Sequence, residues 1–203
     1  MIDSFTGKVH VAGLNPVELS GKKRRQTIGF IPQEPSDLLY GQSVAIECEQ
    51  ADQDNEIPSG TTMALLQQLV PGITPTTHPR DLSEGQRLGL ALSVVLSSNP
   101  HVLVLDEPTR GLDYEAKSEL TRILIDFARL FDKAVVLATH DVEFVAELAT
   151  RVIFIADGEI VADGTTLEVL LSSPAFAPQV AKVMSPQPWL RVRDVVAAIE
   201  ALA

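Results

Sequence analysis

The stretch VLVLDE at residues 102–107 decides the fold. Its four apolar residues run without interruption and end at two adjacent carboxylates, Asp106 and Glu107. A second unbroken apolar run, AVVL at residues 134–137, follows a segment with helical periodicity. Strands of this kind are typical of parallel sheets that helices cover on both faces. The sequence therefore predicts an α/β fold whose strands are buried on both faces.

The pattern of elements extends from these strands in both directions. Towards the C-terminus it predicts a helix at about 115–131, a strand at 134–138, a helix at 141–149, strands at 151–155 and 159–162, and two or three short helices after residue 164. Towards the N-terminus it predicts a strand at 8–12, a loop at 13–21 and a strand at 27–31. Residues 36–60 are expected to be irregular, with a solvated acidic patch at 52–56, and to be followed by helices at 61–70 and 84–98. We therefore expect a helical insertion between two strands of the sheet.

Composition and charge limit the classes of protein to which the chain can belong. The 203 residues are 45% hydrophobic, enough for one substantial core. A net charge of −11 argues against nucleic acid as a partner, because phosphate binding requires a basic face. The basic run at 22–25 is interpreted as a solvated loop, with a binding patch as the alternative. The apolar stretches are too short to span a bilayer and residues 1–10 have no signal-peptide core, so we expect a cytosolic protein. We expect Cys48, the single cysteine, to be a small buried or partly buried residue.

The two carboxylates after the first apolar strand have a specific chemical use. Open α/β sheets bind ligands at the carboxyl ends of their strands. In a nucleotide hydrolase the first carboxylate, here Asp106, holds Mg²⁺, usually through water, and the second, Glu107, orients or polarises the attacking water. The alternative is a strand-end turn with two solvated acids.

Three further sites carry groups that suit a phosphate or a metal. In LSEGQ, residues 82–86, Ser83 and the backbone N–H groups stand at a helix start and can point at an anion, although Ser83 is also an ordinary N-cap residue. His140 follows an apolar strand and can donate to a terminal phosphate, or be a satisfied strand-end histidine. Gln33 follows the strand at 27–31 and can reach a metal or water, or be a surface amide.

Taken together and in this order, these segments resemble the ATP-binding subunits of ABC transporters. The five motifs and their counterparts are FIPQE at 30–34, similar to the Q-loop, LSEGQ at 82–86, similar to the signature, LVLDEP at 103–108, similar to Walker B, GLD at 111–113, similar to the D-loop, and THD at 139–141, similar to the switch-histidine loop. The resemblance covers essentially the whole chain. It implies a P-loop NTPase-like (RecA-like) parallel sheet with an inserted helical subdomain at about 36–98.

The resemblance also implies roles for the residues that would face one nucleotide. Glu107 would polarise the attacking water and Asp106 would hold Mg²⁺ by way of water. Gln33 would sense the γ-phosphate and the metal and would couple the site to the membrane subunits, and His140 would steady the transition state. ATP and Mg²⁺ are thus the implied ligands.

In the family two ATPase domains face each other head to tail, so that each nucleotide lies between two domains. Ser83, Gly85 and Gln86 would then serve the nucleotide of the opposite domain, and Asp113 would cross the interface to connect the two sites. The implied partners are a second ABC ATPase domain, as a homodimer or heterodimer, and the transmembrane transporter subunits. The implied location is the cytoplasmic face of the cell membrane.

Several details resemble one branch, the energy-coupling-factor (ECF) ATPases of vitamin and metal-ion uptake. They are EPTRGLD at 107–113, the LSEGQ form of the signature, and the tail with PAFAPQ at 174–179 and PWL at 188–190. The chain resembles the second half of a tandem subunit, with an ATPase domain at 1–170 and a C-terminal helical extension at 171–203. Glu84 departs from the commoner LSGGQ signature and adds a carboxylate close to the expected phosphate position.

One expected part of such a site is absent from the sequence. A P-loop requires Gly-x-x-x-x-Gly-Lys-Ser/Thr, and the nearest string, Gly21-Lys22, has Pro16 at the first glycine position and Lys23 at the hydroxyl position. Because the strand at 8–12 follows the P-loop helix in the family, we interpret the chain as truncated, incomplete at its N-terminus and inactive alone. The alternative is a non-hydrolysing partner module that supplies its signature to a complete subunit. The ABC ATPases of DNA repair or translation fit the sequence less well.

Overall fold

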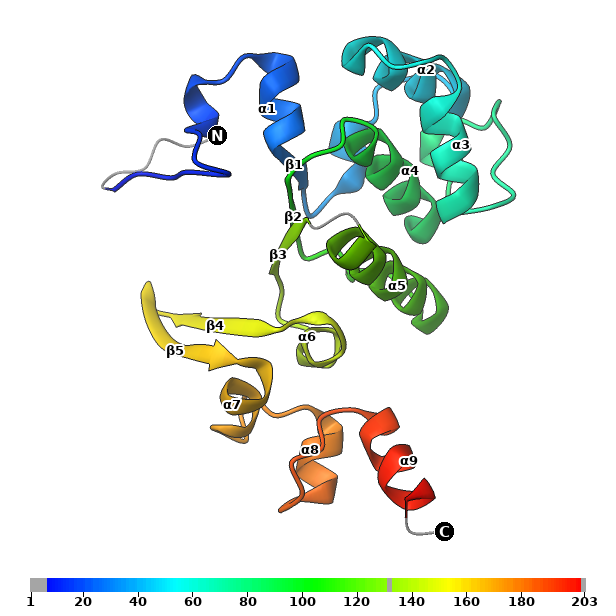
Figure 1. Cartoon of the computed structure of the whole chain (residues 1–203). Helices are drawn as coiled ribbons and strands as arrows, with labels where there is room; N and C mark the ends of the chain where they lie inside the picture. The colour runs from blue at the N-terminus through cyan, green and yellow to red at the C-terminus, as the bar shows by residue number, and fades with distance from the viewer. Residues whose placement is uncertain (1–6, 131–132, 202–203) are drawn as a thin grey trace. The chain divides into compact units, whose positions relative to one another are not determined.

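The computed structural model describes residues 7–130 and 133–201, which divide into two compact units, 1–138 and 139–203 (Figure 1). The regular elements of the first unit are η1 Pro16–Glu18, α1 Gly21–Thr27, β1 Ile28–Ile31, η2 Pro35–Leu38, α2 Val44–Asn55, α3 Thr61–Leu69, η3 Pro79–Asp81, α4 Glu84–Leu96, β2 Val102–Asp106, α5 Tyr114–Leu130 and β3 Ala134–Ala138. Those of the second unit are α6 Val142–Leu148, β4 Arg151–Ala156, β5 Glu159–Thr165, α7 Thr166–Leu171, α8 Gln179–Met184 and α9 Val192–Glu200.

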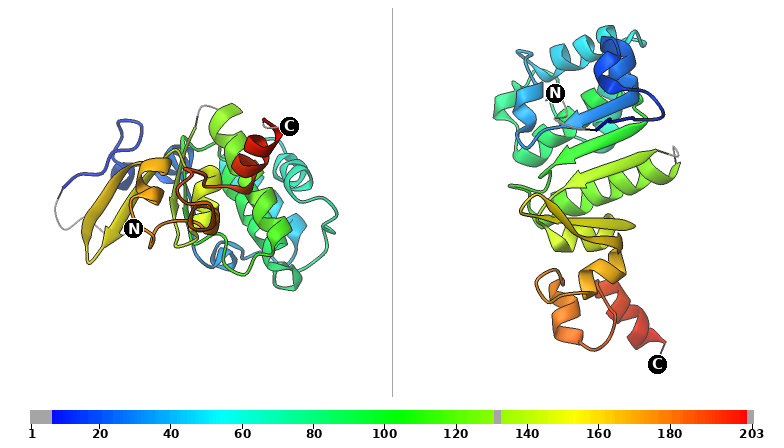
Figure 2. Two further views of the ribbon diagram at one scale, coloured as in Figure 1. Left: turned by 90° about the horizontal axis from the view of Figure 1, so that it is seen from below. Right: turned by 90° about the vertical axis from the view of Figure 1, so that its left-hand side faces the viewer.

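The first unit is built on a parallel sheet in the order β1-β2-β3, which Figure 2 shows most clearly in its right-hand view. In the register, Ile31 lies opposite Leu105, and Asp106 lies opposite Ala138. The central strand is β2, whose Leu103 and Leu105 are fully buried. The chain returns from β1 to β2 through α2, α3 and α4, and from β2 to β3 through α5, as parallel strands require. The predicted α/β fold with a parallel sheet is confirmed.

The burial of β3 differs from the prediction that these strands are covered on both faces. Side chains along β3 alternate between exposed and half-buried, and Val136 keeps 51% of its surface exposed. Among the described strands β3 pairs only with β2, so it lies at the edge of the sheet. An apolar composition alone does not reveal whether a strand is central or at an edge.

A helical cluster stands between β1 and β2 in the chain, as predicted. Its core is formed by residues of α2, α3, α4 and their connections: Val44, Cys48, Leu66, Ile73, Leu82 and Leu90. Burial and the nearby carboxylates of Asp52 and Glu47 raise the pKa of the Cys48 thiol to about 12, which keeps it neutral at physiological pH. Cys48 is thus the small buried residue that its isolation in the sequence indicates.

Two predictions for residues 36–60 were wrong. The segment expected to be irregular contains the twelve-residue helix α2, which begins at the N-cap Ser43. The acidic patch at 52–56 is not uniformly solvated, because the Asp52 side chain is only 2% exposed. The apolar face of α2 is narrow, and its many polar residues mask the helical period.

Residues 7–20 also differ from the prediction. The strand expected at 8–12 is replaced by a single antiparallel bridge between Val11 and Leu14, with Gly13 at φ +77° in the turn. A strand needs a neighbour to pair with, and among the described strands none is paired with this segment. The expected loop at 13–21 contains the short 3₁₀ helix η1.

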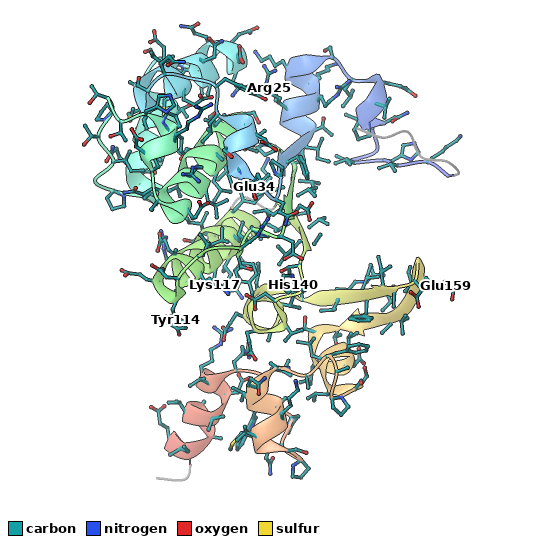
Figure 3. All side chains as sticks on the ribbon, turned by 180° about the vertical axis from the view of Figure 1, so that it is seen from behind. Arg25, Glu34, Tyr114, Lys117, His140 and Glu159 are labelled. Carbon is teal, nitrogen blue, oxygen red and sulfur yellow. The ribbon has the colours of Figure 1, made fainter. Side chains whose placement is uncertain are left out.

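The basic run at 22–25 lies in helix α1, not in a solvated loop. Arg24 donates to the backbone carbonyls of Pro16, Val17 and Leu19, and so holds the preceding turn. Arg25 donates to the Asn55 side chain and the Asp54 carbonyl at the C-terminal end of α2, and Figure 3 shows it between the two helices. These cations therefore serve the packing of the fold.

The second unit combines an antiparallel hairpin with four helices. Strands β4 and β5 are joined at Asp157-Gly158, both with positive φ, as a tight hairpin turn requires. Phe154 of β4 stacks against Phe176, with ring centroids 3.9 Å apart. A small core links the helices: Ala146, Leu170, Ala177, Ala181 and Leu190. Over the described ranges of both units, no helix combines the length and the apolar character needed to cross a membrane.

Candidate functional site

The carboxyl ends of β1 and β2 bring two of the predicted residues, Gln33 and Glu107, to one cavity. Gln33 follows β1, and Asp106 and Glu107 end β2, at neighbouring positions of the same sheet edge. The cavity has a volume of about 230 Å³ and is lined by residues of three segments: Gln33, Glu34, Pro35, Glu84, Leu88, Glu107, Pro108, Arg110, Gly111 and Leu112. The N-terminal turn of α4 thus lines the same cavity as the loops after β1 and β2. The sequence pattern does not show this proximity.

Glu107 occupies a strained backbone position at the point where β2 ends. Its φ is +46°, unusual for a residue with a side chain, and its N–H donates to the Ala138 carbonyl at 2.8 Å. The following turn is closed by the Arg110 N–H, which donates to the Glu107 carbonyl at 3.2 Å. Residues held in such conformations cost of order 1 kcal/mol and cluster at functional sites. The half-buried Glu107 lines the cavity from this position.

An ion pair joins the two strand ends at the rim of the cavity. Arg110 Nη1 lies 3.0 Å from Glu34 Oε1, although the two residues are 76 positions apart in the chain. Both side chains are more than half exposed, so the pair contributes about 0–1 kcal/mol at most. It links the loop that carries Gln33 to the loop that carries Glu107 without adding much stability.

The signature segment forms a capping box at the start of α4. The Ser83 hydroxyl accepts from the Gln86 N–H at 3.2 Å, and the Gln86 side chain accepts from the Ser83 N–H at 3.0 Å. Ser83 is thus the N-cap residue that its alternative interpretation predicts. A hydroxyl that accepts keeps its O–H for donation, and Ser83 is exposed. The same residue can therefore cap the helix and donate to an external anion.

Two glycines allow α4 to approach the loop after β2. Gly111 has φ +73°, and a Cβ there would lie 3.4 Å from Glu84 Cγ. A Cβ on Gly85 would lie 3.2 Å from the Ala116 Cβ, tighter than most contacts. Asp113 ends this loop, and its carboxylate accepts from the Ala116 N–H at 2.8 Å at the start of α5. The D-loop-like and signature-like segments are therefore packed against each other within the first unit.

The extra carboxylate of the signature, Glu84, is neutralised by the residue that directly follows the motif, Arg87. Arg87 Nη1 lies 2.7 Å from Glu84 Oε1, one helical turn away. Arg87 was not among the residues predicted for the site. The signal available in the sequence is the i,i+3 spacing of opposite charges in a helix.

His140 belongs to the second unit, where it precedes Asp141, the N-cap residue of α6 (Figure 3). The Asp141 carboxylate accepts from the Phe144 N–H at 3.1 Å, and the Thr139 hydroxyl accepts from the Asp141 N–H at 3.1 Å. The local turn is therefore well defined, and a joint role of His140 with Glu107 stays a prediction.

The residues of the first unit fit a magnesium nucleotide in part. Mg²⁺ prefers oxygen ligands and is commonly held by one or two carboxylates together with substrate phosphates. Asp106 at the end of β2 offers such a carboxylate, and Gln33 offers an amide oxygen from the neighbouring strand end. The 203 residues contain no Gly-x-x-x-x-Gly-Lys-Ser/Thr string to wrap the phosphates.

Comparison with known proteins decides the family. A family model described as "AAA domain, putative AbiEii toxin, Type IV TA system" matches residues 27–146, more than half of the chain. A protein of Streptomyces coelicolor described as a putative ABC transporter ATP-binding protein is 52% identical over 96% of this chain and 34% of its own length. The chain belongs to the family of this AAA-domain model, and it is similar in sequence to ABC transporter ATP-binding proteins.

Two further comparisons show similarity to ABC transporter proteins in sequence and in fold. The energy-coupling factor transporter ATP-binding protein EcfA1 of Methanospirillum hungatei is 31% identical over 81% of this chain and 61% of its own length. The structure of cbiO1 from Clostridium perfringens, part of the ABC transporter complex cbiONQ, superimposes with a TM-score of 0.71 at 24% identity. The superposition covers 98% of this chain and 78% of the cbiO1 chain. It shows that the fold is that of an ABC ATPase. The chain spans only about a third of the length of the Streptomyces relative.

Proposed function

We propose that this chain is the signature-bearing and carboxylate-bearing part of the ATPase of an ABC transporter of the energy-coupling-factor type, which drives uptake of a vitamin or a metal ion. The observation that carries the proposal is the cavity where Gln33, Glu107 and the first turn of α4 meet. The ECF-like motifs and the similarity to an ECF ATP-binding protein support the finer assignment.

Within the proposed site, the two carboxylates after β2 have different tasks. Mg²⁺, when bound, would neutralise charge that develops on the transferred phosphoryl group. Asp106 would hold that ion by way of water, together with Gln33. Glu107, which lines the cavity, would accept hydrogen bonds from the attacking water and orient it in line. His140 of the second unit would donate to the γ-phosphate.

The first turn of α4 would bind the nucleotide of a second ATPase domain. Ser83 is exposed, and with the N–H groups of the helix start it forms a donor set for an anion. Gly85 and Gln86 complete the turn, and Asp113 would reach across the same interface. Neutralisation of Glu84 by Arg87 removes the repulsion that an unpaired carboxylate would impose on a phosphate. The membrane-spanning subunits of the transporter are the other proposed partners.

We propose that the phosphate-binding loop comes from polypeptide outside these 203 residues. The sequence has no P-loop string, and β3 is an edge strand in the described chain with Val136 half exposed. An apolar edge strand of this kind is normally covered by further structure. If that polypeptide belongs to the same subunit, the subunit is an ATP-hydrolysing ATPase. If it belongs to a complete partner subunit, this chain is the non-hydrolysing partner module.

The role of Glu107 is tested by a Glu107→Gln substitution in a longer protein that contains this chain and a P-loop. The amide keeps the size of the side chain but is a far weaker base, so we expect turnover to fall by about two to four orders of magnitude with little change in nucleotide binding. Glu115→Gln is the matched control, because Glu115 is an exposed carboxylate in the first turn of α5. Near-normal hydrolysis in the Glu107 variant would remove this residue from the reaction.

A further inference from the structure

Arg87 makes more polar contacts than any role as a surface charge would require. Its Nη1 lies 2.7 Å from Glu84 Oε1, its Nη2 donates to the Leu82 carbonyl at 2.8 Å and to the Arg80 carbonyl at 3.3 Å, and its Nε donates to the Pro79 carbonyl at 3.4 Å. The side chain is only 17% exposed. One guanidinium therefore binds three of the four backbone carbonyls of residues 79–82, which lead into the signature.

The geometry of these contacts fixes the course of the backbone before Ser83. The short helix η3, Pro79–Asp81, is followed by its C-cap residue Leu82, which is buried in the helical cluster. Three carbonyls from this segment converge on the planar guanidinium, which presents five donors in a rigid fork. The lysine ammonium has three donors on a flexible stem and cannot reproduce this fork. The chain is thus held in the extended conformation from which Ser83, with φ −63° and ψ 164°, caps α4.

The ion pair with Glu84 gives the arrangement its charge balance. The N-terminus of a helix favours negative charge, so an unpaired cation at this position would be unfavourable. Glu84 in the first turn supplies the anion, and Gly111 lies against the same side chain. Arg87 and Glu84 together therefore join the turn before the signature, the signature itself and the loop after β2.

We infer that Arg87 is a positioning residue for the trans nucleotide site: it holds residues 79–83 so that the Ser83 hydroxyl and the first N–H groups of α4 are set for the phosphates of the opposite nucleotide. The inference rests on the proposed function, because it assigns to the signature a nucleotide held by another domain. Arg87 itself acts through the backbone and makes no contact with the phosphates.

The test uses the longer, P-loop-containing protein and compares Arg87→Gln with Arg87→Lys. Arg87→Gln removes the fork, so we expect the KM for MgATP to rise about tenfold, because the displaced turn would lose roughly one hydrogen bond from Ser83 or the helix start to the phosphates. Arg87→Lys should recover only part of this loss, while the thermal midpoints of both variants stay within about 3 °C of the parent. Arg80→Gln is the matched control, because the exposed Arg80 contributes its carbonyl, and no side-chain contact, to the Arg87 fork.

The outcomes separate a failure of the inference from a failure of the proposed function. An unchanged KM in both Arg87 variants would overturn the inference, as would a fall in kcat and thermal midpoint with KM unchanged, the pattern of a structural role alone. Ser83→Arg in the same protein tests the site itself, because bulk at Ser83 would block the shared interface. If Ser83→Arg abolishes hydrolysis while the Arg87 variants keep the parent KM, only the inference fails. If Ser83→Arg is harmless, the proposed trans site fails and the inference fails with it.

Discussion

Asp52 shows how a single buried side chain supports the helical cluster. Its carboxylate accepts from the Gly60 N–H at 2.7 Å, from the Thr62 N–H at 2.8 Å and from the Thr62 hydroxyl at 2.6 Å. The two N–H groups belong to Gly60, the N-cap residue of α3, and to Thr62 in its first turn, and Gly60 has no side chain that could cap the helix. A residue of α2 therefore caps the next helix, and it is a charge at the favourable end of the helix dipole.

Replacement of Asp52 by alanine should therefore destabilise the chain strongly. Two N–H groups and a fully buried hydroxyl would lose their acceptor, so we expect the free energy of unfolding to fall by about 3 kcal/mol. Chemical denaturation of both proteins measures the difference. Asp54→Ala is the control, since Asp54 is exposed on the same helix and should change stability by less than about 0.5 kcal/mol. Equal effects of the two substitutions would show that Asp52 is not a cap.

At the residue scale, the sequence identified the chemistry of the site better than its support. The Asp106-Glu107 pair and Gln33 follow strands that hydrophobic runs reveal, so their common sheet edge could be predicted. Asp52 was expected to be solvated, because its run of polar neighbours gives no sign of the N–H donors eight to ten residues away. Arg87 was missed for the same reason: the carbonyls it binds become its neighbours only when the turn is folded.

At the scale of elements, the contact between α3 and α4 depends on a glycine inside a helix. Gly89 lies in the middle of α4 and is buried, and a Cβ there would lie only 2.2 Å from Val70 Cγ2. Glycine in a helix interior costs about 1 kcal/mol relative to alanine, so helix propensity alone would favour alanine. The close approach of the residue that ends α3 opposes that preference.

We expect Gly89→Ala to destabilise the chain by about 1–3 kcal/mol, because the overlap with Val70 exceeds the gain in helix propensity. Thermal or denaturant unfolding measures the change. The double variant Gly89→Ala with Val70→Ala removes the overlapping methyl groups and should be more stable than the two single changes predict together. Simple additivity of the two changes would contradict this explanation of the glycine.

The elements that the sequence predicted well are those with a strong hydrophobic period. The three parallel strands, α3, α4 and α5 lie close to their expected bounds. The helices α1 and α2 were missed because their residues are mostly polar and their stability comes from contacts made after folding, such as those of Arg25 with the end of α2. The strand expected at 8–12 failed because no described strand pairs with it. A local hydrophobic pattern is therefore not enough to predict a strand when the sequence does not also show which strand it pairs with.

At the scale of the whole molecule, the proposed ATPase site is shared. In this proposal the chain would contribute Glu107 and the Gln33 loop, which line the cavity, together with Asp106 at the end of β2 and the signature turn of α4. Its sequence contains no P-loop string. In P-loop proteins this loop supplies the N–H groups and the lysine that bind the β- and γ-phosphates. The predicted division into an ATPase domain at 1–170 and an extension at 171–203 stays a prediction, as do the metal, nucleotide and interface roles of individual residues.

The most direct test of this shared site is calorimetry with MgATP and the folded chain of residues 1–203. We predict no binding tighter than about 1 mM, which corresponds to about 4 kcal/mol, because the phosphates have no cradle. The longer protein that contains the P-loop is the positive control and should bind MgATP measurably under the same conditions. A dissociation constant in the low micromolar range for residues 1–203 alone would contradict the account, since these residues would then hold a complete nucleotide site.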